Sequence, residues 1–236
     1  MSGDNRRYYP AHLDVADRHC LVVGGGAVGL RKVRTLLECG ARVTVVSLAL
    51  HPDLEQLASD GTITAHVREY RTSDLDGVFL VICATDHEPT NEKVGVQSRE
   101  RNLLVNVADR PRECTFILPS VLRRGALVLT ISTGGKSPAF AKRLRRELEQ
   151  RFGPEYGPFL DIMGAARSRL LAKEHAPEEH RSLFGAIIDR GLLDLVRNRD
   201  VTGIDQLLAH VLGPGFTLAE IAPETLRDLS RDNIRQ

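Results

Sequence analysis

The chain has 236 residues with a formal net charge of +1, 42% hydrophobic residues and 27% charged residues. This length corresponds to one or two domains, and the composition excludes wholesale disorder. The near-zero charge excludes a chain that is basic throughout, no apolar run is long enough for a transmembrane helix, and the polar residues 1–10 lack the apolar core of a secretory signal. We therefore expect neither a nucleic acid nor a membrane as a partner.

The first half of the chain alternates between strand and helix patterns. Five short apolar runs have the composition of strands buried in a sheet: 19–24, 42–46, 63–67, 78–84 and 103–107. Three segments between them have helical spacing: 27–39, 52–59 and 89–101. Strands that alternate with helices predict a parallel sheet with right-handed crossovers. The fold class is therefore α/β, with a Rossmann-type, doubly wound first domain.

The pattern changes after Asp109. Two apolar runs, 116–122 and 126–132, are joined by Arg123-Arg124-Gly125 and predict an antiparallel hairpin. A helix follows, with Ser137 as its N-cap, Pro138 at its first position and Gly153 as its stop. Its apolar stripe is expected at Phe140, Leu144 and Leu148.

Only helices are predicted from residue 154 to the end, with breaks at Pro177, Gly191, Gly213-Pro214 and Pro223. The expected domains are a nucleotide-binding domain at 1–113, a small α+β region with the hairpin and its helix at 114–152, and a helical domain at 153–236.

The strongest local signal is a glycine-rich turn between the first strand and the first helix, Gly24-Gly25-Gly26-Ala27-Val28-Gly29. It matches G-x-G-x-x-G in the strand–turn–helix context that a dinucleotide site requires. Gly24 allows the tight turn, Gly26 lets the backbone approach a diphosphate, and Gly29 lets helix and strand pack closely. The helix N-terminus then offers free N–H groups to the phosphates. The alternative is a glycine-rich turn that binds nothing.

Two further positions are expected near the dinucleotide. Ser47 stands at the end of the second strand, where an NAD-binding fold usually carries an acidic residue. Its hydroxyl can bind a ribose hydroxyl and does not repel a 2′-phosphate, so this position leaves NAD and NADP undecided. Thr85 ends the fourth strand, on the rim where ligands bind, or belongs to a simple turn. For Asp86 we favour a cap of the helix that begins near Pro89.

Polar residues on the same rim are candidates for chemistry. Asn106 and Asp109 close the fifth strand. A carboxyl group there acts as a general base if partial burial raises its pKa. The alternatives are a solvated turn for Asp109 and a hydrogen-bonded core amide for Asn106. The segment Ser132-Thr133-Gly134-Gly135-Lys136-Ser137 precedes a helix, where its amides and lysine cap the helix and could cradle an anion.

No metal site is predicted. The four cysteines lack CxxC spacing, and the eight histidines lack metal-ligand spacing. We expect the cysteines to be buried, reduced thiols in a cytoplasmic protein: Cys20, Cys39, Cys83 and Cys114.

Together, these segments resemble the family of precorrin-2 dehydrogenase and sirohydrochlorin ferrochelatase, which forms the N-terminal part of siroheme synthase. The resemblance rests on VVGGGAVGLRKVRTLLECGARVTVV, ATDHEPTN, LLVNVADRPRECTFILPS and ISTGGKSPAFAKRLRREL, in matching order from about Asp14 to Phe152. It implies NAD as the cofactor, oxidation of precorrin-2 to sirohydrochlorin, and iron insertion in some members. It also implies a homodimer in which the hairpin and the helices after it exchange contacts, and a missing methyltransferase half.

The resemblance also assigns roles to residues. Asp109 matches the catalytic aspartate, the proton acceptor, and Ala27, Val28, Leu48 and Ala49 match residues at the dinucleotide. Thr133 stands where some members carry a modified serine. The tetrapyrrole substrate is expected at Asn106, Arg110, Ser132, Thr133, Gly134 and Lys136, with Arg112 and Lys142 as further cations for its carboxylates.

Two alternatives stay open at this point. A non-enzymatic regulatory domain that binds a nucleotide would share the glycine turn. Such domains usually carry an acidic residue after the second strand, and they give no reason for Asp109 with the S-x-G-G-x-S-P loop. Within the family, the chain could be a bifunctional enzyme that also inserts Fe²⁺. No His or Cys cluster supports iron insertion, although Asp109 alone could suffice.

Overall fold

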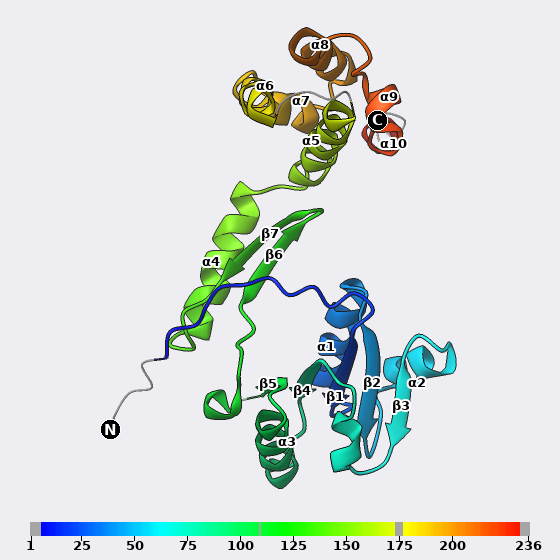
Figure 1. Ribbon diagram of the computed structural model, residues 1–236, viewed down its shortest axis with the longest axis vertical. Coiled ribbons are helices and arrows are strands. Elements are labelled where there is room, and N and C mark those ends of the chain that lie inside the picture. Colours follow the sequence, from blue (N-terminus) through cyan, green and yellow to red (C-terminus); the bar gives the residue numbers. More distant parts are fainter. Residues whose placement is uncertain (1–5, 109, 173–176, 232–236) are drawn as a thin grey trace. The chain divides into compact units, whose positions relative to one another are not determined.

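The computed structural model describes residues 6–108, 110–172 and 177–231, with only the backbone at 177–180 (Figure 1). The chain divides into two compact units. The first comprises the chain through Leu118 together with Thr133–Ser137, and the second comprises Pro119–Ser132 and the chain from Pro138 onward. The predicted domain boundaries at residues 113 and 152 stay predictions.

The first unit is a parallel sheet of five strands with the order β3-β2-β1-β4-β5. The strands are β1 (His19–Val23), β2 (Arg42–Ser47), β3 (Thr64–Val67), β4 (Leu80–Cys83) and β5 (Leu104–Val107). The helices are α1 (Ala27–Glu38), α2 (Pro52–Ser59) and α3 (Glu88–Glu100), with short 3-10 turns η1 (Thr72–Leu75) and η2 (Pro111–Glu113). The order reverses between β1 and β4, so the predicted Rossmann-type topology is confirmed.

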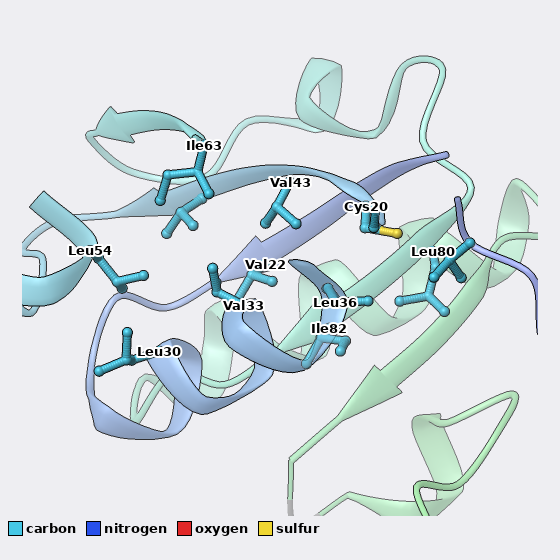
Figure 2. Close-up of a cluster of buried hydrophobic side chains, with 13 residues drawn as sticks. Cys20, Val22, Leu30, Val33, Leu36, Val43, Leu54, Ile63, Leu80 and Ile82 are labelled. Carbon is cyan, nitrogen blue, oxygen red and sulfur yellow. The ribbon is translucent and has the colours of Figure 1, made fainter. Parts of the chain in front are cut away.

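Both faces of the central strands β1 and β4 are buried, which explains their continuous apolar sequence. Alternate residues of β1 point to opposite faces. Cys20 and Val22 pack with α1 and α2 in one cluster (Figure 2), whereas Leu21 and Val23 belong to a second cluster that includes Val94 of α3. The two helical layers hold the carboxyl ends of the strands at one rim of the sheet.

The hairpin differs from the prediction in its length and its turn. Its strands are β6 (Ser120–Arg124) and β7 (Leu127–Ile131), so the apolar run that begins at Phe116 is not one continuous strand. Phe116 instead packs against the first cluster of the sheet, beside β5. The turn is Gly125-Ala126 rather than 123–125, because Gly125 has φ +55° and glycine adopts this conformation without strain.

The second unit continues with helices in its described part, as predicted. They are α4 (Pro138–Arg151), α5 (Tyr156–Leu171), α6 (Pro177–Asp189), α7 (Leu192–Arg197), α8 (Val201–Leu212), α9 (Leu218–Ile221) and α10 (Pro223–Arg231). The apolar stripe predicted for α4 is wrong in one position, because Phe140 is 52% exposed and Ala141 is buried in its place. No helix in the described ranges is long and apolar enough to cross a membrane.

Candidate dinucleotide-binding site

The glycine turn joins β1 to α1 in a conformation that side chains would prevent. Gly24 has φ +116°, and a Cβ there would lie 2.5 Å from the carbonyl oxygen of Ala84 at the end of β4. A Cβ at Gly29 would overlap the carbonyl oxygen of Gly24. Because the colliding atoms are backbone atoms, a substitution at either glycine must move a strand or the helix. These two glycines therefore hold the turn close to the sheet.

Gly25 is equally constrained, although the motif treats its position as variable. A Cβ there would overlap the carbonyl oxygen of Ala49, in the segment after β2. The Gly25 amide donates to Oγ of Ser47 at 2.9 Å, and the amide of His51 donates to the carbonyl of Gly25 at 2.8 Å. Ser47 therefore braces the turn, a function that the motif does not reveal. The sequence signal for this contact was that Gly25 belongs to a run of three consecutive glycines.

Gly26 faces open space. It is the N-cap of α1 with φ −79°, and a Cβ there would meet no atom within 4 Å. The Leu30 amide donates to the Gly26 carbonyl at 2.9 Å, and the amides that precede it are the donors that an α-helix leaves without a partner inside the helix. An open space in front of free N–H groups and a positive helix end fits a diphosphate, so these residues fit the predicted dinucleotide.

Apolar side chains lie beside this anion site without being buried. Val28 in the first turn of α1 is 43% exposed, and Leu48 after β2 is 71% exposed. Ala49 and Ala27 are exposed as well. Exposed apolar groups next to a polar anchor are typical of a site that covers a flat ligand. The roles assigned to these residues stay predictions.

Thr85 lies at the carboxyl end of β4 and is held by α3. Its Oγ1 donates to Oδ1 of Asn91 at 2.6 Å, and Nδ2 of Asn91 donates to the Thr85 carbonyl at 2.8 Å. The thiol of Cys83 also donates to Oδ1 of Asn91 at 3.0 Å. Sequence reasoning gave no role to Asn91, although it closes the segment ATDHEPTN that carries part of the resemblance.

Burial raises the pKa of the Cys83 thiol to about 12, so the thiol keeps its proton at neutral pH and remains a donor. All four cysteines are free, and three of them are buried while Cys39 is half-buried. The expected cap at Asp86 is wrong, since the N-cap of α3 is His87, whose amide donates to Thr85 Oγ1 at 3.2 Å. The hydroxyl of Thr85 therefore accepts the hydrogen bond that holds the turn before α3.

Asn106 is engaged in the structure of the sheet edge. Its Nδ2 donates to the carbonyl of Phe116 at 3.1 Å and lies 3.7 Å from Sγ of Cys114. The Val107 amide donates to the same sulfur at 3.2 Å. These contacts match the alternative of a hydrogen-bonded amide, and a substrate contact of Asn106 stays a prediction. Asp109 lies outside the described residues.

Arg110 is neutralised by two carboxylates. Its guanidinium forms ion pairs with Glu113, at 3.0 Å, and with Glu88. Glu113 is mostly buried while Glu88 is exposed. These ion pairs tie the turn after β5 to the start of α3. The structural role of Arg110 is therefore to hold this turn. A substrate carboxylate has to compete with Glu88 and Glu113 for its guanidinium group.

The second predicted anion site is a loop with its own internal bonds. Oγ1 of Thr133 accepts from the Ser137 amide at 3.0 Å, and the Thr133 carbonyl accepts from the Lys136 amide at 3.1 Å. Gly134 and Gly135 have φ +60° and +81°, and a Cβ at either would meet no atom within 4 Å. Ser132 belongs to the second unit. Whether this loop meets the glycine turn stays a prediction.

No metal-binding group of three or more His, Cys, Asp or Glu occurs in the part of the chain that the structure describes.

Comparison with known protein families gives two matches along the chain. Residues 11–120 match a family described as putative NAD(P)-binding, and residues 124–151 match the central part of sirohaem biosynthesis proteins. A siroheme synthase of Thioalkalivibrio sulfidiphilus is 38% identical over 217 residues, which cover 92% of this chain and 44% of that protein. A siroheme synthase of Nitrosococcus oceani is 40% identical over 70% of this chain and 35% of that protein.

The chain thus spans less than half the length of these curated relatives. Among solved structures, one titled SirC, precorrin-2 dehydrogenase, is similar with a TM-score of 0.74 and 25% identity. That similarity covers 87% of this chain and 99% of the other.

The geometry of the glycines predicts two different effects of adding one methyl group. Gly26→Ala should leave the melting temperature unchanged, since its Cβ meets no atom, and weaken NAD⁺ binding by about tenfold or more, since the methyl group fills the space for the diphosphate. Isothermal titration and thermal unfolding measure the two quantities. As the matched control, Gly29→Ala should lower the melting temperature through its collision with Gly24. Unchanged NAD⁺ affinity in Gly26→Ala would contradict the site.

Proposed function

Since the chain belongs to the family of precorrin-2 dehydrogenase and the N-terminal part of siroheme synthase, we propose that it oxidises precorrin-2 to sirohydrochlorin with NAD⁺. The observation that carries the proposal is the open space at Gly26, in front of the orphan amides of α1. The residues that form this site belong to a fold that matches a precorrin-2 dehydrogenase over 99% of that chain.

Three groups of residues would hold the cofactor. The amides at the start of α1 bind the diphosphate, Ser47 binds a ribose hydroxyl, and Val28, Leu48 and Ala49 supply apolar surface. Thr85 stands at the strand end beside the turn, fixed by Asn91. The bound nicotinamide supplies the acceptor for the hydride that the substrate loses.

The residues after β2 support NAD⁺ rather than NADP⁺. A 2′-phosphate is usually met by an arginine near this position. Residues 48–52 contain no arginine or lysine. Arg34 of α1 forms an ion pair of 2.5 Å with Asp53 in the first turn of α2, so its charge is already compensated.

The dehydrogenation releases a hydride and a proton from the substrate. We assign the proton to the carboxylate of Asp109, which in the sequence comes two residues after Val107, the last residue of β5. Arg110, braced by Glu113 and Glu88, fixes the chain immediately after it. The substrate's carboxylates would meet the amides of Thr133 and Gly134 and the charge of Lys136, with Asn106 at the strand end.

The whole proposal is tested by an anaerobic assay with precorrin-2 and NAD⁺. We expect NADH and sirohydrochlorin in equal amounts, and a slower reaction with NADP⁺ at the same concentration. Adding Fe²⁺ as a substrate shows whether the product is also metallated. NAD⁺ binding without NADH formation would contradict the enzyme and favour the regulatory domain that shares the glycine turn.

Removing one carboxylate tests the assignment of the base. Asp109→Ala should lower kcat by about 10²–10⁴-fold, because the proton loses its acceptor, and should leave NAD⁺ affinity nearly unchanged. Steady-state kinetics and titration measure both effects. Asp86→Ala is the matched control, because Asp86 is an exposed acidic residue after the neighbouring strand β4, and it should retain activity. Full activity in Asp109→Ala would refute the assignment.

We propose further that the chain is a homodimer that pairs through the hairpin and α4, in a cytoplasmic setting that suits its free thiols. The two-stranded sheet of β6 and β7 is too small to be stable by itself, and both of its outer edges can pair. Val121 on β6 is 43% exposed and Phe140 on α4 is 52% exposed. These apolar side chains suit a contact between two copies.

A charge on this surface should separate the copies. Val121→Glu should convert the dimer to a monomer at micromolar concentration, because a carboxylate would be buried without a partner. Light scattering measures the mass. Ile188→Glu, a charge at an exposed apolar residue of α6, should remain dimeric. A monomeric unmodified chain, or a dimer that survives Val121→Glu, would contradict the proposed contact.

A further inference from the structure

The hydroxyl of Thr85 belongs to a hydrogen-bond network at the end of β4 whose centre is the side chain of Asn91. Asn91 lies in the first turn of α3 and is only 7% exposed. Its Nδ2 donates to the Thr85 carbonyl at 2.8 Å, and its Oδ1 accepts from the Thr85 hydroxyl at 2.6 Å and from the Cys83 thiol at 3.0 Å. A single buried amide group therefore binds three groups at the end of one strand.

The direction of each bond in this network is determined by its chemistry. A backbone carbonyl can only accept, so the Asn91 amide must turn its Nδ2 toward the Thr85 carbonyl. With the opposite orientation, two acceptor oxygens would face each other at 2.8 Å. Oδ1 then faces the thiol and the hydroxyl, and because Oδ1 can only accept, both of these groups must donate. Burial raises the pKa of the Cys83 thiol to about 12, so the thiol has a proton to donate at neutral pH.

The Thr85 hydroxyl has one proton, and the bond to Asn91 uses it. The carbonyl of His87 is a more distant acceptor at 3.2 Å, and it already accepts from the Asn91 amide at 3.1 Å. The His87 amide donates to the Thr85 hydroxyl oxygen at 3.2 Å and occupies one of its two lone pairs. Contacts among the described residues leave the other lone pair available, and Thr85 is only half-buried. Toward a ligand, Thr85 is therefore an acceptor and not a donor.

Thr85 also lies directly beside the glycine turn. A Cβ at Gly24 would come within 3.0 Å of the Thr85 amide nitrogen. In the sheet, β1 has β2 on one side and β4 on the other. A dinucleotide crosses such a sheet where the strand order reverses, with its diphosphate at the turn after β1. Since the adenosine ribose is assigned to Ser47 on the β2 side, the nicotinamide riboside half extends over the end of β4.

We propose that Asn91 is a positioning residue that makes the Thr85 hydroxyl an acceptor for a hydrogen-bond donor on the nicotinamide riboside half of the coenzyme. This inference rests on the dinucleotide site of the proposed function. The nicotinamide riboside half carries two kinds of donor, the carboxamide N–H groups and the ribose hydroxyls. ADP has the adenosine and the diphosphate but lacks this half. The network should therefore raise the affinity for NAD⁺ without changing the affinity for ADP.

The test is calorimetric titration of the full chain with NAD⁺ and, separately, with ADP. Thr85→Val removes the hydroxyl at nearly unchanged volume and should weaken NAD⁺ binding by about fivefold, the contribution of one hydrogen bond, with unchanged ADP binding. Thr85→Ser keeps the hydroxyl and should retain the NAD⁺ affinity. Asn91→Leu releases the hydroxyl proton and should weaken NAD⁺ binding as Thr85→Val does. Equal weakening for both ligands, or unchanged NAD⁺ binding in either Thr85→Val or Asn91→Leu, would overturn the proposal.

A matched control and an analogue complete the design. Thr90 lies in the same turn of α3, and its hydroxyl bonds to Nδ1 of His87 at 2.9 Å, so Thr90→Val should bind both ligands normally. The analogue is 3-acetylpyridine adenine dinucleotide, which keeps both riboses but has no carboxamide N–H. Thr85→Val should leave its affinity unchanged if the carboxamide is the donor, and should weaken it as it weakens NAD⁺ if a ribose hydroxyl is the donor.

The same titrations distinguish a failure of this inference from a failure of the proposed function. If the unmodified chain binds neither ADP nor NAD⁺, the dinucleotide site itself is refuted, and the role of Asn91 is refuted with it. If the chain binds both ligands and every variant keeps its preference for NAD⁺, only the role of Asn91 and Thr85 is overturned. Because the titration measures no turnover, its result does not depend on whether precorrin-2 is oxidised.

Discussion

The close approach of three glycines to the main chain around them is the constraint on which the site depends. Gly24 lies against the end of β4, Gly25 lies against the segment after β2, and Gly29 lies against Gly24 itself. In each case the opposing atom is a carbonyl oxygen of the backbone, which cannot rotate away as a side chain could. The turn is thereby pressed into the sheet, and only Gly26 and the amides that follow it face outward.

Much of the fold could be predicted because its signals are local. The continuous apolar runs of β1 and β4 and the breaks at Gly191 and Pro223 match the observed elements closely. The hairpin was harder, because Phe116 is apolar for a tertiary reason. It packs beside β5 in the first unit, whereas β6 begins only at Ser120. Periodicity alone does not reveal to which core an apolar residue belongs.

The site shows a similar division between what local patterns reveal and what they hide. The motif revealed Gly24, Gly26 and Gly29, since their roles follow from one turn. The bracing contacts of Ser47 and Asn91 depend on segments that are distant in the chain, and no spacing rule encodes them. Likewise, the sequence alone suggests that Arg110 is an unpaired cation, but in the structure its charge is compensated by Glu113 and Glu88.

The contacts of Gly24 and Gly25 also tie ligand affinity to the folding of the whole first unit. The turn can form only after β1, β2 and β4 have assembled, and these strands are separated by long stretches of chain. The unfolded chain therefore has no partial version of the pocket, and a bound dinucleotide stabilises the native unit by mass action. Binding of the dinucleotide and folding of the first unit are therefore thermodynamically linked through this turn.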